Sequence, residues 1–171
     1  MKIIFVDGYN VLHSWKELKM EKEYSFQGAR QKLVDMLHNY ASYIECRIIL
    51  VFDGYKVPGN LEAREDVNQD ITIIYTKDGE TADSYIEKEV NNLGRRYEIY
   101  VVTSDLLEQQ TVFQRGAVRI SSIEFHNEVK KVQKNIMKME NNHVIPKNHL
   151  QDNIDLDILK KLEEIRRSDL K

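Results

Sequence analysis

The sequence predicts a single α/β domain with a mostly parallel central sheet of about five strands. Two observations lead there. Short apolar runs alternate with longer stretches of helical periodicity, and the runs are apolar throughout instead of alternating with polar residues. Strands of that composition are buried on both faces, as in parallel sheets covered by helices. A chain of 171 residues has the size of one such domain.

The expected strands lie at 2–6, 47–52, 71–75, 98–102 and, more weakly, 117–120. Apolar residues at i, i+3 and i+4 spacing predict amphipathic helices over 26–44 and 82–93. A further helix is expected from about 122 to 139, opened by Ser121 and Glu124 in capping-box register. This alternation favours a parallel sheet with helices packed on it.

The C-terminal part has a different character. Residues 141–153 lack periodicity and contain Pro146, which predicts a connecting loop. Helical spacing returns in a last stretch around Ile158 and Ile165. We expect residues 1–140 to form the domain and residues 141–171 to add a loop and a C-terminal helix docked on it. A frayed tail or a partner-binding helix is the alternative.

Composition limits the possible partners. The formal net charge of −3 gives no global attraction to nucleic acid, so a polyanion would need a local patch or a cation. No apolar stretch approaches the roughly 20 residues that span a bilayer, and the N-terminal run is too short for a secretory signal. The lone Cys46 is expected to be a buried structural thiol and favours a reducing cytoplasm.

Acidic residues recur where the predicted strands end. Asp7 and Asp53 each follow an apolar run directly, and Asp105 follows the run at 98–102. Three more acids open the helix after the third run at spacings of three and four residues: Glu80, Asp83 and Glu87. Because the carboxyl ends of parallel strands and the starts of the following helices share one edge, Asp7, Asp53, Asp83 and Asp105 should meet there.

A group of carboxylates in one cleft predicts a cation site. Such groups raise one another's pKa values unless a cation compensates their charge. Oxygen ligands without Cys or His favour Mg²⁺ or Mn²⁺, and one or two such ions suit phosphodiester hydrolysis. Taken singly, each acid has an alternative role: Asp7 or Asp53 as a turn residue, Ser104 or Asp105 as a helix cap, and the three helical acids as a solvated face.

Aromatic and basic residues near this edge are candidates for holding a substrate. Tyr9 and Tyr55 follow the edge glycines and could stack on unpaired bases, although Tyr9 could equally pack under the first helix. Ser104 could donate to phosphate, and Asn10 could bind phosphate, align a ligand or cap the following helix. The basic residues that could meet phosphates are Lys56, Arg64, Arg95 and Arg96.

Five stretches, in this order and spacing, carry a family resemblance: FVDGYNVLH, LVFDGY, GETADSYIEKE, VVTSD and QRGAVRISSIEF. From residue 3 to about 125 the chain resembles the NYN-domain ribonucleases, relatives of the PIN-domain nucleases, and specifically their YacP-type bacterial branch. The resemblance implies a PIN-like three-layer α/β/α fold. It also implies a magnesium-dependent endoribonuclease that acts on RNA, with mRNA the expected substrate, in association with the ribosome.

The resemblance maps Asp7, Asn10, Asp53, Asp83 and Asp105 onto the family's acidic metal site, with Glu80 and Glu87 as further candidate members. We assign Asp7, Asp83 and Asp105 as core ligands, while Asp53 completes the cluster or orients a water. Two rivals stay open: a non-catalytic RNA- or ribosome-binding module, and a metal-dependent DNA nuclease. A binding module has no physical reason to keep mutually repelling acids. We expect no membrane partner and favour a monomer.

Overall fold

The computed structural model describes residues 1–54, 62–104 and 117–142. The chain divides into two compact units, Met1–Lys134 and Asn135–Lys171, and the first unit contains the whole described sheet. No helix of the described residues is long and apolar enough to cross a membrane. The expected C-terminal helix lies outside the described residues, so the division at residue 140 stays a prediction.

The described sheet has six strands in the order β3-β4-β2-β1-β5-β6. All neighbours are parallel except β3, which runs antiparallel to β4 at one edge. The strand bounds are β1 (Lys2–Asp7), β2 (Arg47–Phe52), β3 (Ala63–Asp66), β4 (Ile71–Tyr75), β5 (Glu98–Val102) and β6 (Val118–Ile120). The five runs predicted from the sequence are the five parallel strands.

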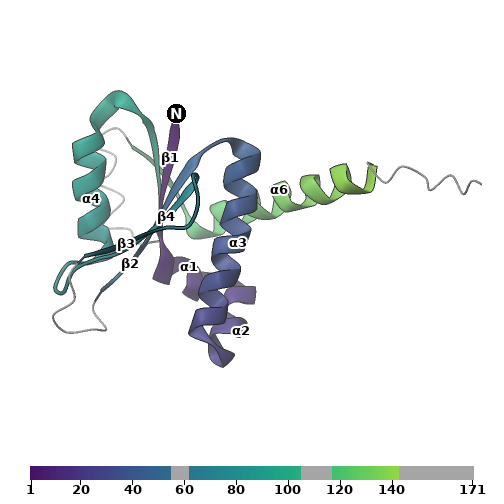
Figure 1. Ribbon diagram of the computed structural model, residues 1–171, viewed down its shortest axis with the longest axis horizontal. Coiled ribbons are helices and arrows are strands. Elements are labelled where there is room, and N and C mark those ends of the chain that lie inside the picture. Colours follow the sequence, from purple (N-terminus) through teal and green to yellow (C-terminus); the bar gives the residue numbers. More distant parts are fainter. Residues whose placement is uncertain (55–61, 105–116, 143–171) are drawn as a thin grey trace, which may run out of the picture. The chain divides into compact units, whose positions relative to one another are not determined.

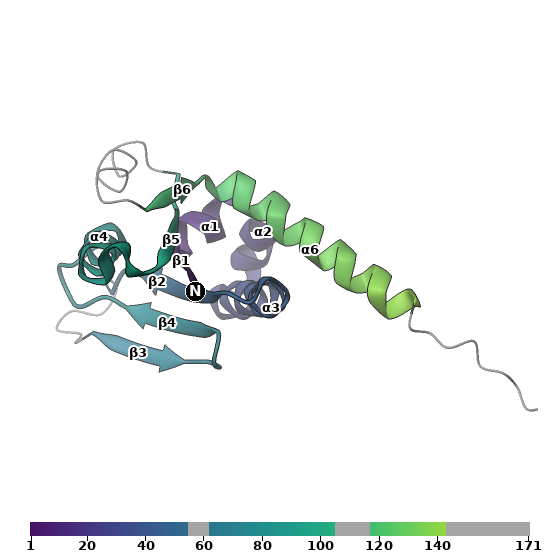
Figure 2. The same cartoon turned by 90° about the horizontal axis from the view of Figure 1, so that it is seen from above.

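Helices cover both faces of this sheet (Figures 1 and 2). In the view of Figure 2, α4 lies on one face, and α1, α2, α3 and the start of α6 lie on the other. The helix bounds are α1 (Gly8–Ser14), α2 (Lys16–Tyr24), α3 (Phe26–Ile44), α4 (Ala82–Leu93), the short 3₁₀ helix η1 (Gly94–Arg96) and α6 (Ser122–Asn142). The domain is therefore the expected three-layer α/β/α fold.

Burial explains why β1 is the central strand. Ile4, Phe5 and Val6 have no exposed surface, and β1 pairs with β2 on one side and β5 on the other. Phe5 packs into a core cluster with Ile86 and Val90 of α4. Successive side chains point to opposite faces, so Ile4 and Val6 face the other helical layer. A run that is apolar on both faces is what this position requires.

The sequence did not predict β3. All four of its residues are exposed, and three of them are charged. Arg64 donates to the Asp66 carboxylate at 3.0 Å, which leaves a charged edge strand with no apolar side to recognise. Charged edges prevent pairing with further chains. The number of strands in the described sheet is therefore six, one more than expected.

The helices α1 and α2 were also not predicted as separate elements. They are short, and the main feature that fixes them is Trp15, which lies between them with 1% of its surface exposed. Its indole N–H donates to the Ser122 carbonyl at 3.0 Å, and its ring stacks on His126 with centroids 4.4 Å apart. Both contacts join residues more than 100 positions apart, so local periodicity carries no sign of them.

The start of α6 confirms the predicted capping box. The Glu124 N–H donates to Ser121 Oγ at 3.2 Å, and the Ser121 N–H donates to Glu124 Oε2 at 2.9 Å. Hydrogen bonding of the Glu124 carboxylate to the side chain and to the N–H of Ser121 lowers its pKa. The helix then continues to Asn142, three residues beyond the predicted end.

An ion pair between α2 and α6 predicts a pH-dependent contribution to stability. Glu17 Oε1 lies 2.7 Å from His126 Nε2 and 3.5 Å from Lys130 Nζ. Burial opposes ionisation, but the hydrogen bond from His126 and the charges of His126 and Lys130 together outweigh it and lower the pKa of Glu17. Glu17→Gln should reduce the free energy of unfolding by about 1 kcal/mol at pH 7. Urea unfolding followed by circular dichroism measures this loss.

The loss should shrink as the pH falls. A carboxylate with a lowered folded-state pKa stabilises the protein above its ordinary pKa of 4.5, and this contribution disappears as the pH falls through the lowered value. Glu21→Gln is the matched control, because Glu21 makes only an exposed ion pair with Lys32 at 4.0 Å. A Glu17→Gln effect of equal size at pH 3 and pH 7 would contradict the assignment.

Candidate acidic site at the carboxyl edge of the sheet

Asp7 ends β1 and begins α1. Its side chain caps the helix, because Oδ1 accepts the Asn10 N–H at 3.0 Å. The register pairs Asp7 with Val51 of β2, two residues before Asp53, so both acids leave the sheet at one edge. The capping role that we considered for Asn10 belongs to Asp7 instead, and Asn10 lies within the helix.

Asp53 follows β2 and is bonded to the start of α4. Its Oδ1 accepts the N–H of Ala82, the first residue of that helix. Thr81 caps the same helix by accepting the Ser84 N–H at 3.2 Å. Because Asp53 holds the first turn of α4 against the end of β2, Asp83 in that turn comes close to the other two acids.

The electrostatics of Asp7 couple it to two of the other acids. Burial raises its pKa, the Asn10 N–H opposes this rise, and the charges of Asp83 and Asp53 add to it, which brings the pKa to about 6. Burial and like charge both penalise the ionised form. Two of the acids predicted to meet Asp7 at this edge, Asp83 and Asp53, therefore act on it.

Asn10 contributes a second unusual feature. Its Oδ1 is buried and has no hydrogen-bond partner among the described residues. A buried amide oxygen left in this state costs about 1–3 kcal/mol. Asn10 comes three residues after Asp7, and the Asn10 N–H already donates to the Asp7 carboxylate. The oxygen is thus available to a ligand or to a water at this site.

The donor chemistry fits a hard cation. Asp7, Asp53 and Asp83 offer carboxylate oxygens and Asn10 an amide oxygen, which are the ligands that Mg²⁺ and Mn²⁺ prefer. Within the described ranges, however, no three His, Cys, Asp or Glu side chains are grouped closely enough to hold a metal by themselves. Asp105, the fourth predicted acid, lies outside those ranges. A complete ligand set would need Asp105 or water.

Glu80 and Glu87 are placed differently from Asp83. Glu80 precedes the cap of α4, so the helical spacing that groups the three acids does not apply to it. Its Oε1 lies 3.9 Å from Lys88 Nζ, and its charge raises the pKa of Tyr85. Glu87 is half-buried on α4. The acids that raise the pKa of Asp7 are Asp83 and Asp53.

Tyr9 packs inside the domain edge. Its ring meets the Phe52 ring edge-on at 5.3 Å and lies 5.7 Å from the Phe26 ring. Burial and the nearby Asp53 raise the pKa of the Tyr9 hydroxyl. The ring is therefore held rigidly beside Asp53. Ser104 is exposed just after β5, at the same edge of the sheet.

Among the described residues, the predicted basic residues Arg64 and Arg96 lie on elements that carry none of these acids. Arg64 pairs with Asp66 on the edge strand β3. Arg95 and Arg96 belong to η1, which leads into the amino end of β5, so Arg96 lies at the opposite edge of the sheet. Figure 1 shows that the end of α4 that leads into η1 lies on the same side of the sheet as the N-terminus. Tyr55 and Lys56 lie outside the described residues.

The glycines of the two Asp-Gly pairs serve close packing. Neither Gly8 nor Gly54 has a positive φ, so neither is needed for a left-handed backbone conformation. A Cβ on Gly8 would overlap the Phe52 ring, and a Cβ on Gly54 would overlap the carbonyl oxygen of Thr76. The two glycines allow three strand ends to lie close together, which the acids at this edge require.

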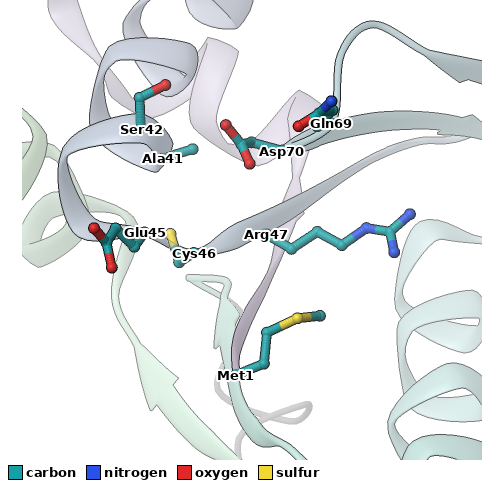
Figure 3. A pocket seen from close by; sticks show the side chains of 8 residues that line it. All are labelled: Met1, Ala41, Ser42, Glu45, Cys46, Arg47, Gln69 and Asp70. Carbon is teal, nitrogen blue, oxygen red and sulfur yellow. The ribbon is translucent and has the colours of Figure 1, made fainter.

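A hollow lies at the amino edge of the sheet, opposite the edge that carries Asp7 and Asp53 (Figure 3). It has a volume of about 430 Å³ and includes Glu45, Cys46 and Asp70. Burial raises the pKa of the Cys46 thiol to about 11, so this thiol stays protonated at neutral pH. The predicted burial of Cys46 is confirmed.

The mostly parallel α/β/α sandwich, with an acid at the carboxyl end of its central strand, is the fold that the resemblance to the PIN-like class implies. Residues 4–167 match the YacP-like NYN domain, and the chain belongs to this family. The family is consistent with a nuclease-type fold.

Individual relatives agree with this assignment. The chain is 38% identical to an uncharacterized protein, YacP, of Bacillus subtilis (strain 168) over 173 residues, 99% of each chain. It also resembles the crystal structure of Rae1 (YacP) from Bacillus subtilis, with a TM-score of 0.73 and 36% identity, covering 99% of this chain and 97% of that one. The crystal structure of a mutant of the same Rae1 protein matches with a TM-score of 0.72 and 35% identity, covering 99% and 98%.

The raised pKa of Asp7 predicts a stabilising substitution. Asp7→Asn keeps a cap acceptor for the Asn10 N–H but removes the buried charge. In EDTA at pH 7 the variant should unfold with a free energy higher than wild type by on the order of 2 kcal/mol. Urea denaturation measures the difference.

The size of this effect depends on pH. Between the ordinary pKa of 3.8 and about 6, the unfolded chain ionises before the folded one. Wild-type protein therefore loses stability relative to the variant as the pH rises through this window, and the two converge below pH 4. Asp35→Asn, on the exposed face of α3, should change stability by less than about 0.5 kcal/mol at either pH. A variant less stable than wild type at pH 7 would refute the buried-charge account.

Substitutions at two glycines test the close approach of the main chain next to Asp53. Gly54→Ala should reduce the free energy of unfolding by roughly 3 kcal/mol or more, because its Cβ meets backbone that cannot move aside. Gly79→Ala is the comparison, since Gly79 has a φ of +81° but open space around it, and should cost about 1 kcal/mol. Equal losses in thermal or urea unfolding would show that Gly54 is not packed as described.

Proposed function

We propose that the protein is a metal-dependent endoribonuclease that hydrolyses phosphodiester bonds of RNA, with mRNA as its substrate in association with the ribosome. One observation carries the proposal: the carboxylate of Asp7 is buried beside Asp53 and Asp83, and their charges raise its pKa. An acid kept in this position gains from a cation that compensates the charge. Membership of the YacP-like NYN family supports the same chemistry.

The ligand oxygens would come from several segments. Asp7 and Asp83, with Asp105, would hold one or two Mg²⁺ or Mn²⁺ ions. A bound ion of this kind activates water and neutralises phosphate charge. Asp53 has one oxygen engaged by the Ala82 N–H, so its other oxygen would orient the attacking water. The unpartnered Asn10 oxygen would accept a hydrogen bond from that water or from a substrate hydroxyl.

Substrate contacts would come from the same edge. Tyr9 offers a half-buried ring fixed by Phe52 and Phe26, and Ser104 offers an exposed hydroxyl. Tyr55 and Lys56 follow Gly54 directly and would supply an aromatic ring and a positive charge. Arg64 would reach only RNA that extends along β3, and Arg96 lies too far around the domain for the scissile phosphate.

A cleavage assay tests the proposal. End-labelled single-stranded RNA and DNA of matched sequence are incubated with wild type, Asp83→Asn or the exposed control Asp35→Asn, in Mg²⁺ or EDTA, with and without ribosomes. We expect internal cuts in RNA that need Mg²⁺. Asp83→Asn should slow them on the order of 100-fold or more, and Asp35→Asn should leave them unchanged.

The outcomes separate the rivals. Equal cutting of DNA and RNA would favour a DNA nuclease, because an RNA-specific site senses the 2′-hydroxyl. No cutting in any arm, with ribosome binding intact in wild type and Asp83→Asn, would favour a binding module. Cuts on ribosome-bound mRNA alone would assign the ribosome as part of the working complex.

A further inference from the structure

Thr76 connects the two segments that carry Asp53 and Asp83. It follows β4 directly and has no exposed surface. Its hydroxyl accepts the Gly54 N–H at 2.9 Å and donates to the Glu80 carbonyl oxygen at 2.6 Å. Its own N–H donates to the Phe52 carbonyl at 3.0 Å. One buried residue thus bonds to the main chain on both sides of the acidic site.

The contact with Gly54 is close as well as hydrogen-bonded. No Cβ could fit on Gly54, because the Thr76 carbonyl oxygen occupies the space. The segment that carries Asp53 is therefore seated directly on Thr76. The position of Gly54 therefore depends on the position of Thr76.

The contact with Glu80 acts on the other segment. Glu80 closes a turn in which its N–H donates to the Lys77 carbonyl at 3.1 Å, and the next residue caps α4. Asp53 then accepts the N–H of Ala82. Three hydrogen bonds and the main chain between them form a closed ring. It runs from Thr76 to Gly54, along the chain to Asp53, across to Ala82, and along the chain to Glu80, whose carbonyl bonds to Thr76. Asp83 is the residue immediately after this ring.

We propose that Thr76 is a positioning residue, whose hydroxyl sets the spacing of Asp53 and Asp83 around Asp7 and so determines how tightly the site binds a divalent cation. The proposal rests on the function proposed above. Valine has nearly the same shape as threonine but cannot accept from Gly54 or donate to Glu80. Serine keeps both hydrogen bonds.

The same strand offers a matched control. Thr72 is also buried, with 3% of its surface exposed, and its hydroxyl donates to Asp66 Oδ1 at 2.7 Å. This bond leads to the edge strand and not to the acids. Thr72→Val therefore removes a buried threonine hydroxyl of β4 without touching the ring that contains Asp53 and Ala82.

The experiment compares wild type with Thr76→Val, Thr76→Ser and Thr72→Val by calorimetric titration with Mn²⁺. Thr76→Val should weaken Mn²⁺ binding about 10-fold or more and raise the Mg²⁺ concentration for half-maximal RNA cleavage in parallel. Thr76→Ser should stay within about 3-fold of wild type, and Thr72→Val should match wild type. Thr76→Ala is made alongside, so that loss of the hydroxyl is measured even where valine prevents folding.

A second readout does not depend on metal. Amide hydrogen exchange at Gly54 and Ala82 should be faster in Thr76→Val and Thr76→Ala, but not in Thr76→Ser or Thr72→Val. Unchanged exchange, or Mn²⁺ affinity equal to wild type in both variants that lack the hydroxyl, would overturn the proposal. If wild type neither binds Mn²⁺ nor cuts RNA, the proposed function and the cation role of Thr76 both fail, whereas accelerated exchange would still support its positioning of the two segments.

Discussion

The buried carboxylate of Asp7 is the constraint on which the site depends. Asp7 cannot move away from its neighbours, because the three preceding residues have no exposed surface and β1 is paired on both sides. The other groups at this edge are arranged around Asp7. The Asn10 N–H comes from α1, and Asp53 and Asp83 come from the end of β2 and the start of α4. None of these three groups carries a positive charge. The Asn10 N–H lowers the pKa of Asp7, but burial and the charges of Asp83 and Asp53 raise it, so none of these groups compensates the charge of an ionised Asp7.

The start of α4 has two opposing effects on that imbalance. Backbone N–H groups at a helix start stabilise negative charge, and Asp53 uses the N–H of Ala82 in this way. The same turn brings Asp83 toward Asp7, which raises the pKa of Asp7. The turn that stabilises the charge of Asp53 therefore also destabilises the charge of Asp7. A cation bound between them would relieve the second effect without disturbing the first, which is why the arrangement favours binding over a purely structural role.

Much of this edge could be predicted from the sequence because two regularities determine it. Apolar runs locate parallel strands, and the residues after such strands share an edge, which places Asp7 and Asp53 together. The sequence predicts the structure less well where these patterns stop. Glu80 lies before the helix begins, so helical spacing misplaces it, and β3 has only charged and small exposed residues. Thr76 escapes notice because a threonine after an isoleucine-rich run fits a strand equally well; its role depends on Gly54, 22 residues away.

The packing beneath the acids explains why the two Asp-Gly-Tyr stretches look alike. Phe52 is completely buried, its ring fills the space where a side chain on Gly8 would lie, and the Tyr9 ring meets it edge-on. On the other side, Phe52 stacks on Tyr75 with centroids 5.7 Å apart, immediately before Thr76. One aromatic side chain thus sets the separation of the ends of β1, β2 and β4. Acids that are held at one edge of the sheet need such a rigid apolar support, because their mutual repulsion alone would drive these loops apart.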